Sequence, residues 1–365
     1  ADGAVRIPCA LTLLRCSRMR RSYFAESAYF GSDANEQKKQ ENKVTIVGVG
    51  AVGMACAFGI LSQGLCSKMV LADIDKKKLD GEVNDLNHAG AFLHASVQAA
   101  GPDYKETAHS KVVIVTAGVR QRTGETRLAL VGRNVEVFKH IIPPIARQSP
   151  DAILLVVSNP CDVLAWVAWK MSGFPVERVI SSGTYLDTSR FRVLLSQRLA
   201  INPQSMHAFI IGEHGDSSVA VWSGVNVGGM SLSQITANCE QDMKDELSAE
   251  VQGLHEKVRN AAYEVISQKG YTNWAIGAAV ATITRTILKD ERRVLCVGIN
   301  AKGLYGIDSD CFISVPSVLG QTGVQHVLSL DLSEMERTQL LASANTLNEV
   351  QQGIAAQVEA AIERA

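Results

Sequence analysis

A histidine and an aspartate in the second half of the chain could together carry acid–base chemistry. His214 lies in the polar turn Gly212-Glu-His-Gly-Asp216 between two apolar runs, and an imidazole gains and loses a proton near neutral pH. Asp187, if paired with His214, would fix the tautomer of the ring and favour its charged form. The alternatives are that His214 is a structural histidine, one of eight in the chain, and that Asp187 only stabilises a helix N-terminus.

Two arginines could bind and polarise a substrate that carries a carboxylate. Arg190 follows Asp187 by three residues and therefore shares its face of a helix. Its planar guanidinium could grip a carboxylate through two parallel hydrogen bonds, with a surface salt bridge as the alternative. Arg127 follows the polar segment 120–126, which we interpret as a lid whose closure would expel water and bring Arg127 to a carbonyl oxygen. These groups are what the reduction of a 2-keto acid requires.

A glycine-rich loop follows the first predicted strand, Val44–Val47. The loop consists of Gly48, Val49, Gly50, Ala51, Val52 and Gly53. Gly48 permits a tight turn, Gly50 lets the backbone approach a pyrophosphate, and Gly53 lets helix and strand pack closely. Asp73, twenty residues beyond Gly53, would accept hydrogen bonds from ribose hydroxyls and repel a 2′-phosphate, which favours NAD over NADP. The alternative is an ordinary glycine-rich turn with a solvated aspartate nearby.

Short apolar runs, separated by stretches long enough for helices, predict a parallel sheet. They are 44–47, 69–72, 112–115 and 153–157. Runs that are apolar throughout belong in a sheet covered on both faces. Their alternation with helices predicts an α/β fold, a Rossmann-type doubly wound parallel sheet. Small and polar residues follow the third and fourth runs, in Thr116-Ala-Gly118 and Ser158-Asn159-Pro160, where such sheets bind ligands.

The second half of the chain changes character and predicts a second, α+β substrate lobe. Strand-like runs at 207–211 and 219–222 flank the His214 turn. Two long helical stretches and two further strands follow, at 242–268, 273–289, 293–297 and 311–315. Ser333 and Glu336 have the spacing of a capping box that opens a last helix. We expect a basic and polar arm at 1–42, an NAD-binding domain at 43–181 and a substrate-binding catalytic domain at 182–365.

Composition argues against several classes of partner. The 365 residues carry a net charge of −1, which offers no electrostatic attraction to nucleic acid or to an anionic membrane. No apolar run approaches the ~18 residues that suggest a membrane span. The eight cysteines include no Cys-x-x-Cys pair, so we expect no metal site. A small-molecule substrate is the expected partner.

The cysteines and the N-terminal arm bear on cellular location. Scattered cysteines in core-like surroundings are typical of reduced, buried thiols, which favours the cytoplasm. The first forty residues are rich in arginine and poor in acids. This pattern leaves open an organellar transit peptide, and equally a disordered or partner-clasping arm.

In order and spacing, the motifs resemble the lactate/malate dehydrogenase family, and within it the L-lactate dehydrogenases. The resemblance spans about Lys43 to Val350. The motifs that carry it are 47–53, 116–118, 124–127, 158–160, 186–192, 212–218 and 269–275. It implies reversible hydride transfer between NADH and pyruvate, giving (S)-lactate, in a two-domain enzyme that forms homotetramers.

The resemblance also implies a role for individual residues. His214 would donate and accept the proton with Asp187 as its partner, Arg190 would anchor the substrate carboxylate, and Arg127 would polarise the carbonyl. Further implied contacts are those of Asn159 with substrate and nicotinamide, of Thr272 with the pocket, and of Thr116, Gly118 and Arg120 with the cofactor.

Substrate choice depends on one position in the predicted lid. Gln121 lies six residues before Arg127, where the resemblance implies Gln in enzymes that accept the methyl of pyruvate and Arg in those that bind a second carboxylate. Arg120 and Arg122 flank Gln121, so a one-residue change of register would favour oxaloacetate. A malate dehydrogenase and a non-catalytic NAD-binding relative remain the alternatives. An epimerase would need a Tyr-x-x-x-Lys pair after the fourth strand, and none is there.

Overall fold

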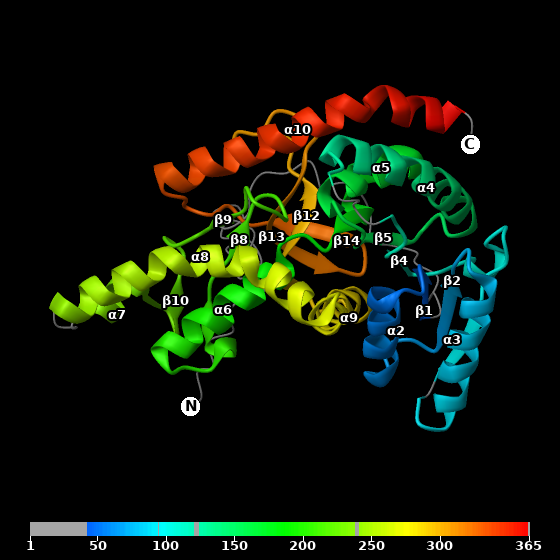
Figure 1. Ribbon diagram of the computed structural model, residues 1–365, viewed down its shortest axis with the longest axis horizontal. Coiled ribbons are helices and arrows are strands. Elements are labelled where there is room, and N and C mark those ends of the chain that lie inside the picture. Colours follow the sequence, from blue (N-terminus) through cyan, green and yellow to red (C-terminus); the bar gives the residue numbers. More distant parts are fainter. Residues whose placement is uncertain (1–41, 94, 120–123, 238–240, 364–365) are drawn as a thin grey trace, which may run out of the picture.

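The computed structural model describes residues 42–93, 95–119, 124–237 and 241–363 (Figure 1). Residues 1–41 of the predicted N-terminal arm and two predicted site residues, Arg120 and Gln121, therefore lie outside the described residues.

Six parallel strands form the centre of the molecule. They are β1 (Lys43–Val47), β2 (Lys68–Ala72), β3 (Ser96–Ala99), β4 (Val112–Val115), β5 (Ile153–Val156) and β6 (Val179–Ser181). Their spatial order is β3-β2-β1-β4-β5-β6, so the predicted doubly wound sheet is confirmed. The sequence did not predict β3 and β6, because only Val97 of β3 is deeply buried and β6 has three residues.

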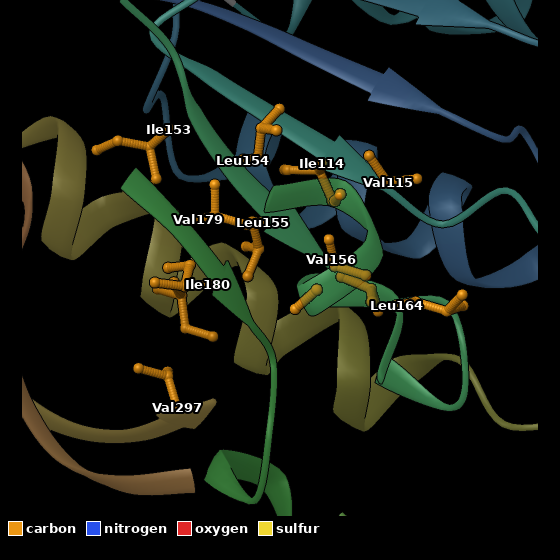
Figure 2. Close-up of a cluster of buried hydrophobic side chains, with 14 of the residues drawn as sticks. Ile114, Val115, Ile153, Leu154, Leu155, Val156, Leu164, Val179, Ile180 and Val297 are labelled. Carbon is orange, nitrogen blue, oxygen red and sulfur yellow. The ribbon is translucent and has the colours of Figure 1, made fainter. Parts of the chain in front are cut away.

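The sheet is buried on both faces by helices. Figure 2 shows Ile114 on β4, Leu155 on β5 and Ile180 on β6 in one apolar cluster, and all three are 0 % exposed. The helices of this half are α2 (Ala51–Ser62), α3 (Lys76–His88), α4 (Arg127–Gln148) and α5 (Cys161–Ser172), with 3₁₀ turns η1 (Ala89–Ala91), η2 (Lys105–Thr107) and η3 (Val176–Arg178). Apolar strands with no polar face require this cover.

Three antiparallel strands continue the same sheet beyond β6. They are β12 (Arg293–Asn300), β13 (Phe312–Gly320) and β14 (Gly323–Val327), and β12 pairs with β6. The predicted strands at 293–297 and 311–315 were too short, since β12 continues through Gly298 and β13 through Pro316. The second half of the chain thus adds strands to the first sheet besides forming a lobe of its own.

That lobe has a separate apolar core. Phe191 and Leu195 of α6 (Tyr185–Leu199) pack there with Leu254 of α8 (Gln241–Lys269). The remaining short elements are η4 (Pro203–Ser205), β7 (Met206–His207), β8 (Ile210–Ile211), β9 (Val219–Ala220), β10 (Asn226–Val227), β11 (Met230–Ser231) and α7 (Leu232–Ala237). The predicted strand at 207–211 is two strands, because β7 pairs with β10 while β8 pairs with β9.

Two further helices tie the halves together. α9 (Trp274–Leu288) packs on α2, and α10 (Glu334–Glu363) crosses α4 and α5 (Figure 1). The predicted capping box is confirmed: the Ser333 N–H donates to Glu336 Oε2 at 2.8 Å, and the Glu336 N–H donates to Ser333 Oγ at 3.4 Å. In the described part of the chain, no helix is both long and apolar enough to cross a membrane.

Candidate active site

The glycine loop between β1 and α2 has the shape that its sequence predicts. Gly48 adopts a φ of +102°, and a Cβ on Gly53 would lie 1.8 Å from the Gly48 carbonyl oxygen. By contrast, a Cβ on Gly50 would have no heavy atom within 4 Å. Gly48 and Gly53 are therefore needed by the turn itself, while Gly50 leaves open space in front of the loop.

This open space faces a helix N-terminus that can receive an anion. Gly50 is the N-cap of α2, and no side chain caps the helix. The backbone N–H groups of Ala51 and Val52 open its first turn, where an N–H has no acceptor within the helix. An uncapped helix N-terminus next to the open space at Gly50 fits the pyrophosphate of a dinucleotide.

Asp73 and Thr116 hold the loop from either side. Asp73 follows β2 and accepts hydrogen bonds from the Val49 N–H at 2.8 Å and the Asp75 N–H at 3.0 Å. The Thr116 hydroxyl contacts the Val47 oxygen at 3.1 Å and the Gly48 oxygen at 2.9 Å. The Asp73 carboxylate thus lies beside the loop, where a ribose would lie. The Thr116 hydroxyl stabilises the turn through the carbonyl groups of Val47 and Gly48. These residues fit NAD.

The predicted proton-transfer pair is formed in the structure. His214 Nδ1 lies 2.6 Å from Asp187 Oδ2, and Arg190 Nη1 donates to the other carboxylate oxygen, Asp187 Oδ1, at 2.7 Å. The Asp187 and Arg190 side chains are 10 % and 19 % exposed, so this is not the surface salt bridge that was the alternative for Arg190. Asp187 also lies in the first turn of α6. The pairing leaves Nε2 of His214 as the ring nitrogen that can face a substrate.

The charges of this cluster favour an imidazolium beside a carboxylate. The Asp187 charge raises the pKa of His214 above 6.5; burial opposes this, while the hydrogen bond to Asp187 and the Asp162 charge add to it. Burial alone would raise the pKa of Asp187, but His214 and Arg190 outweigh it, so that pKa lies below 3.8. The cluster thus favours the charged form of the His214 ring above its ordinary pKa.

A second buried carboxylate, Asp162, contacts the His214 turn and was not predicted. Its Oδ2 accepts the backbone N–H of His214 at 2.8 Å, and its Oδ1 accepts the Ser181 hydroxyl at 2.8 Å. Asp162 is 2 % exposed. The sequence did contain a signal, because Asp162 is the one charge in the apolar stretch from Cys161 to Trp169, and a lone buried charge needs a partner.

Other elements clamp the same turn. Gly212 exchanges backbone hydrogen bonds with Ser314 of β13, at 2.9 and 3.0 Å. Ser343 of α10 accepts the Glu213 N–H at 2.9 Å, and Ser218 lies 3.1 Å from Nε2 of His255 on α8. The turn is thus fixed by contacts from several parts of the chain.

The remaining predicted site residues are only partly described. Arg127 begins α4, but its side chain lies outside the described part, as do Arg120 and Gln121. Asn159 is exposed in the turn between β5 and α5, and Thr272 is half-buried between α8 and α9. Among the hydrogen bonds of the described residues, none joins Asn159 or Thr272 to His214. At Gly118 a Cβ would lie 2.8 Å from Asn134 Oδ1, so the backbone there is closely packed.

The sheet topology brings the glycine loop and His214 to the same edge. The loop leaves β1 at its carboxyl end, and two strands away β5 leads into Asn159 and α5. Asp162 in the first turn of α5 then binds the His214 backbone. His214, the residue predicted for acid–base chemistry, is therefore bound to the start of the helix that follows β5, near the strand ends where an open α/β sheet binds its ligand. No cluster of metal-ligating side chains occurs among the residues that the structure describes.

Comparison with known proteins gives concordant matches for both halves. Residues 42–181 match the description "lactate/malate dehydrogenase, NAD binding domain", and residues 184–358 match its "alpha/beta C-terminal domain". The chain is 52 % identical over 323 residues to the L-lactate dehydrogenase B chain of Sceloporus undulatus, covering 88 % of this chain and 96 % of that one. It is also 52 % identical over 313 residues to the A chain of Ambystoma mexicanum and the B chain of Gallus gallus, covering 86 % of this chain and 93 % of each.

Proposed function

The chain belongs to the lactate/malate dehydrogenase family and is an NAD-dependent oxidoreductase, and on that premise we propose that it is an L-lactate dehydrogenase that interconverts pyruvate and (S)-lactate. The observation that carries the proposal is the His214–Asp187–Arg190 cluster, in which Asp187 Oδ2 lies 2.6 Å from His214 Nδ1. What supports the choice of substrate is the name of relatives 52 % identical to this chain.

In the proposed reduction, the bound nicotinamide supplies the hydride. His214 gives its Nε2 proton to the carbonyl oxygen of pyruvate, because Asp187 occupies Nδ1 and keeps the ring charged. In the reverse direction the neutral ring accepts the hydroxyl proton of lactate. The proton thus moves through one nitrogen in both directions.

Arg190 is proposed to hold the substrate carboxylate. One of its nitrogens is engaged by Asp187 at 2.7 Å, and a guanidinium has five N–H donors in all. The others can bind a carboxylate in a bidentate manner. Arg127 is proposed to polarise the carbonyl from the lid, and Asn159 and Thr272 to line the pocket. Arg120, Thr116 and Gly118 are proposed to support the cofactor.

The proposed cofactor site consists of the glycine loop and Asp73. The N–H groups that open α2 would receive the pyrophosphate, and Asp73 the ribose hydroxyls. We keep the domain boundary after Ser181, because the parallel strands end there and the separate core of the second lobe begins at Phe191.

Substrate specificity is proposed to depend on Gln121. The test is steady-state reduction of pyruvate and of oxaloacetate with NADH, using the full chain. The proposal expects the higher kcat/KM with pyruvate. In Gln121→Arg, the preference should move toward oxaloacetate by at least ~10-fold, which corresponds to about 1.4 kcal/mol. A higher kcat/KM for oxaloacetate in the unchanged protein would make it a malate dehydrogenase, and activity with neither acid would leave an NAD-binding relative.

The proposal includes a homotetramer. The helices α2 and α9 pack on each other and each exposes a large apolar side chain, Phe58 at 51 % and Trp274 at 68 %, and a neighbouring subunit would cover such side chains. Light scattering on the purified protein should give four times the mass of the chain.

We also propose a cytoplasmic location. Five cysteines of the described part are free and buried, and burial raises the pKa of Cys66 and Cys311 to about 12. Imaging the chain with and without residues 1–24 tests the alternative, an organellar address in the arm.

A further inference from the structure

Asp162 combines two contacts that the reaction scheme above does not use. Both of its oxygens accept hydrogen bonds at 2.8 Å, one from the backbone N–H of His214 and one from the Ser181 hydroxyl. The first contact joins residues 52 apart in the chain. It connects the helix that follows the parallel strand β5 to the turn that carries the proposed proton donor.

The surroundings of Asp162 hold its carboxylate in one position. It lies in the first turn of α5, where the helix dipole favours a negative charge. Ser181 ends β6 and is 0 % exposed. Opposite them, β12 has Gly298, where a Cβ would lie 2.6 Å from Asp162 Oδ1 and 2.0 Å from Ser181 Oγ. A side chain at 298 would displace the carboxylate, so three elements together fix its place and its orientation.

We infer that Asp162 is a positioning residue for His214: its carboxylate fixes the backbone of the catalytic turn against the nucleotide-binding sheet and adds a second negative charge beside the imidazole. The inference rests on the proposed function, in which His214 transfers the proton. Asp187 holds the ring of His214 through its side chain, whereas Asp162 holds the same residue through its backbone. The two carboxylates therefore act on one histidine from α6 and from α5.

The consequence is a shift in the pH at which His214 loses its proton. The Asp162 charge is one of the contributions that raise the pKa of His214, after those of Asp187. The other titratable and charged groups around the His214 turn are Asp187, Arg190, Glu213, Asp216, His255 and Arg259. Burial lowers the pKa of His255 to about 4. His255 is therefore neutral from pH 5 upward and does not add a titration step to the pH dependence of the activity in that range.

The test is the pH profile of kcat/KM for pyruvate reduction between pH 5 and 9.5, in the full chain. Asp162→Asn keeps the size of the side chain and an oxygen for the His214 N–H, but removes the charge. Because one negative charge near His214 is lost, we expect the midpoint of the fall in kcat/KM to move to lower pH by about half a unit or more in this variant. Asp162→Ser removes the charge with a smaller side chain and should move the midpoint in the same direction.

The matched control is Glu336→Gln. Glu336 is also 2 % exposed and accepts from a serine hydroxyl and backbone N–H groups, but its partners are Ser223 and Ser333. Its variant should keep the midpoint of the unchanged protein. Melting curves at pH 7 establish that each variant is folded.

The outcomes separate this inference from the function on which it rests. If the unchanged protein reduced neither pyruvate nor oxaloacetate, the proposed function would be overturned. An active protein with a step above pH 6.5 that stays in place in Asp162→Asn and Asp162→Ser would overturn only the inference. If neither variant folded, Asp162 would be a residue of the fold and not of the site, which would also overturn it.

Discussion

The glycine loop and the His214 turn are two parts of one site that are built in different ways. The loop is formed by one continuous segment, and the partners that hold it lie at the ends of the adjacent strands β2 and β4. The turn is held by residues 27, 52 and 130 positions away, namely Asp187, Asp162 and Ser343. The glycine loop can therefore be recognised in a sequence by its spacing, whereas the turn exists only when distant parts of the chain have folded together.

Replacing His214 should give the largest effect and should separate the two regions. In His214→Asn the proton donor is lost, and we expect kcat for pyruvate reduction to fall by roughly 10²–10⁴-fold. The glycine loop shares no hydrogen bond with this residue among those described, so the affinity for NADH should stay within about twofold. Stopped-flow kinetics and NADH fluorescence titration measure the two quantities. A loss of less than tenfold in kcat would refute the role of His214.

The pH dependence of the two directions should differ in sign. Because the pKa of His214 is raised above 6.5, the charged donor persists beyond that pH. The kcat/KM for pyruvate reduction should fall by about tenfold per pH unit above the raised pKa, while that for lactate oxidation should rise through the same pH. Initial rates in both directions from pH 5 to 9.5 test this. Two profiles of the same sign would exclude one shared acid–base group.

The ion pair of His214 with Asp187 should also stabilise the folded protein in a defined pH range. His214, with a raised pKa, contributes stability that is complete below its ordinary value of 6.5 and is lost as pH rises through the raised one. Asp187, with a lowered pKa, contributes stability above its ordinary value of 3.8 that is lost as pH falls. The pair is thus most stabilising between these values, the range in which pyruvate reduction is also expected to be fastest.

Substituting alanine for Gly53 or Gly50 should distinguish the glycine that the loop needs for its fold from the one that it needs only for binding NADH. The Cβ of Gly53→Ala would lie 1.8 Å from the Gly48 oxygen, so we expect the free energy of unfolding to fall by about 1–3 kcal/mol and NADH binding to weaken. In Gly50→Ala the Cβ meets no atom within 4 Å, and only NADH binding should weaken. Urea unfolding and fluorescence titration distinguish the two. Equal unfolding free energies would mean that the loop tolerates the added atom.

The difference between the regions also explains what the sequence could predict. The strands β1, β2, β4 and β5 are apolar except for Lys43, Thr45 and Lys68, since both of their faces are buried, and the sequence predicts all four. Edge strand β3 has a single deeply buried residue, Val97, which leaves no pattern to recognise.

The site residues divide in the same way. The Gly48–Gly53 loop follows from spacing alone, and the pairing of His214 with Asp187 was expected from the residue types. Asp162 was missed, because an acid in the first turn of a helix is common for electrostatic reasons. Its backbone partner could not be identified, because a contact across 52 residues leaves no periodic signal in the sequence.

The smallest effect is expected from a motif that is as local as the glycine loop but lies apart from the chemistry. Ser333 caps α10, accepting the Glu336 N–H at 3.4 Å. In Ser333→Ala the free energy of unfolding should fall by about 0.5–1 kcal/mol, since one N–H of the first turn loses its acceptor. Thr338→Ala is the matched control, because the Thr338 hydroxyl only donates to the Glu334 carbonyl within α10 and helps no terminus. Urea unfolding measures both, and kcat should change in neither. A lower kcat in Ser333→Ala would contradict this expectation. It would mean that a change at the start of α10 also displaces Ser343, which binds the His214 turn, so that the cap and the turn are not independent.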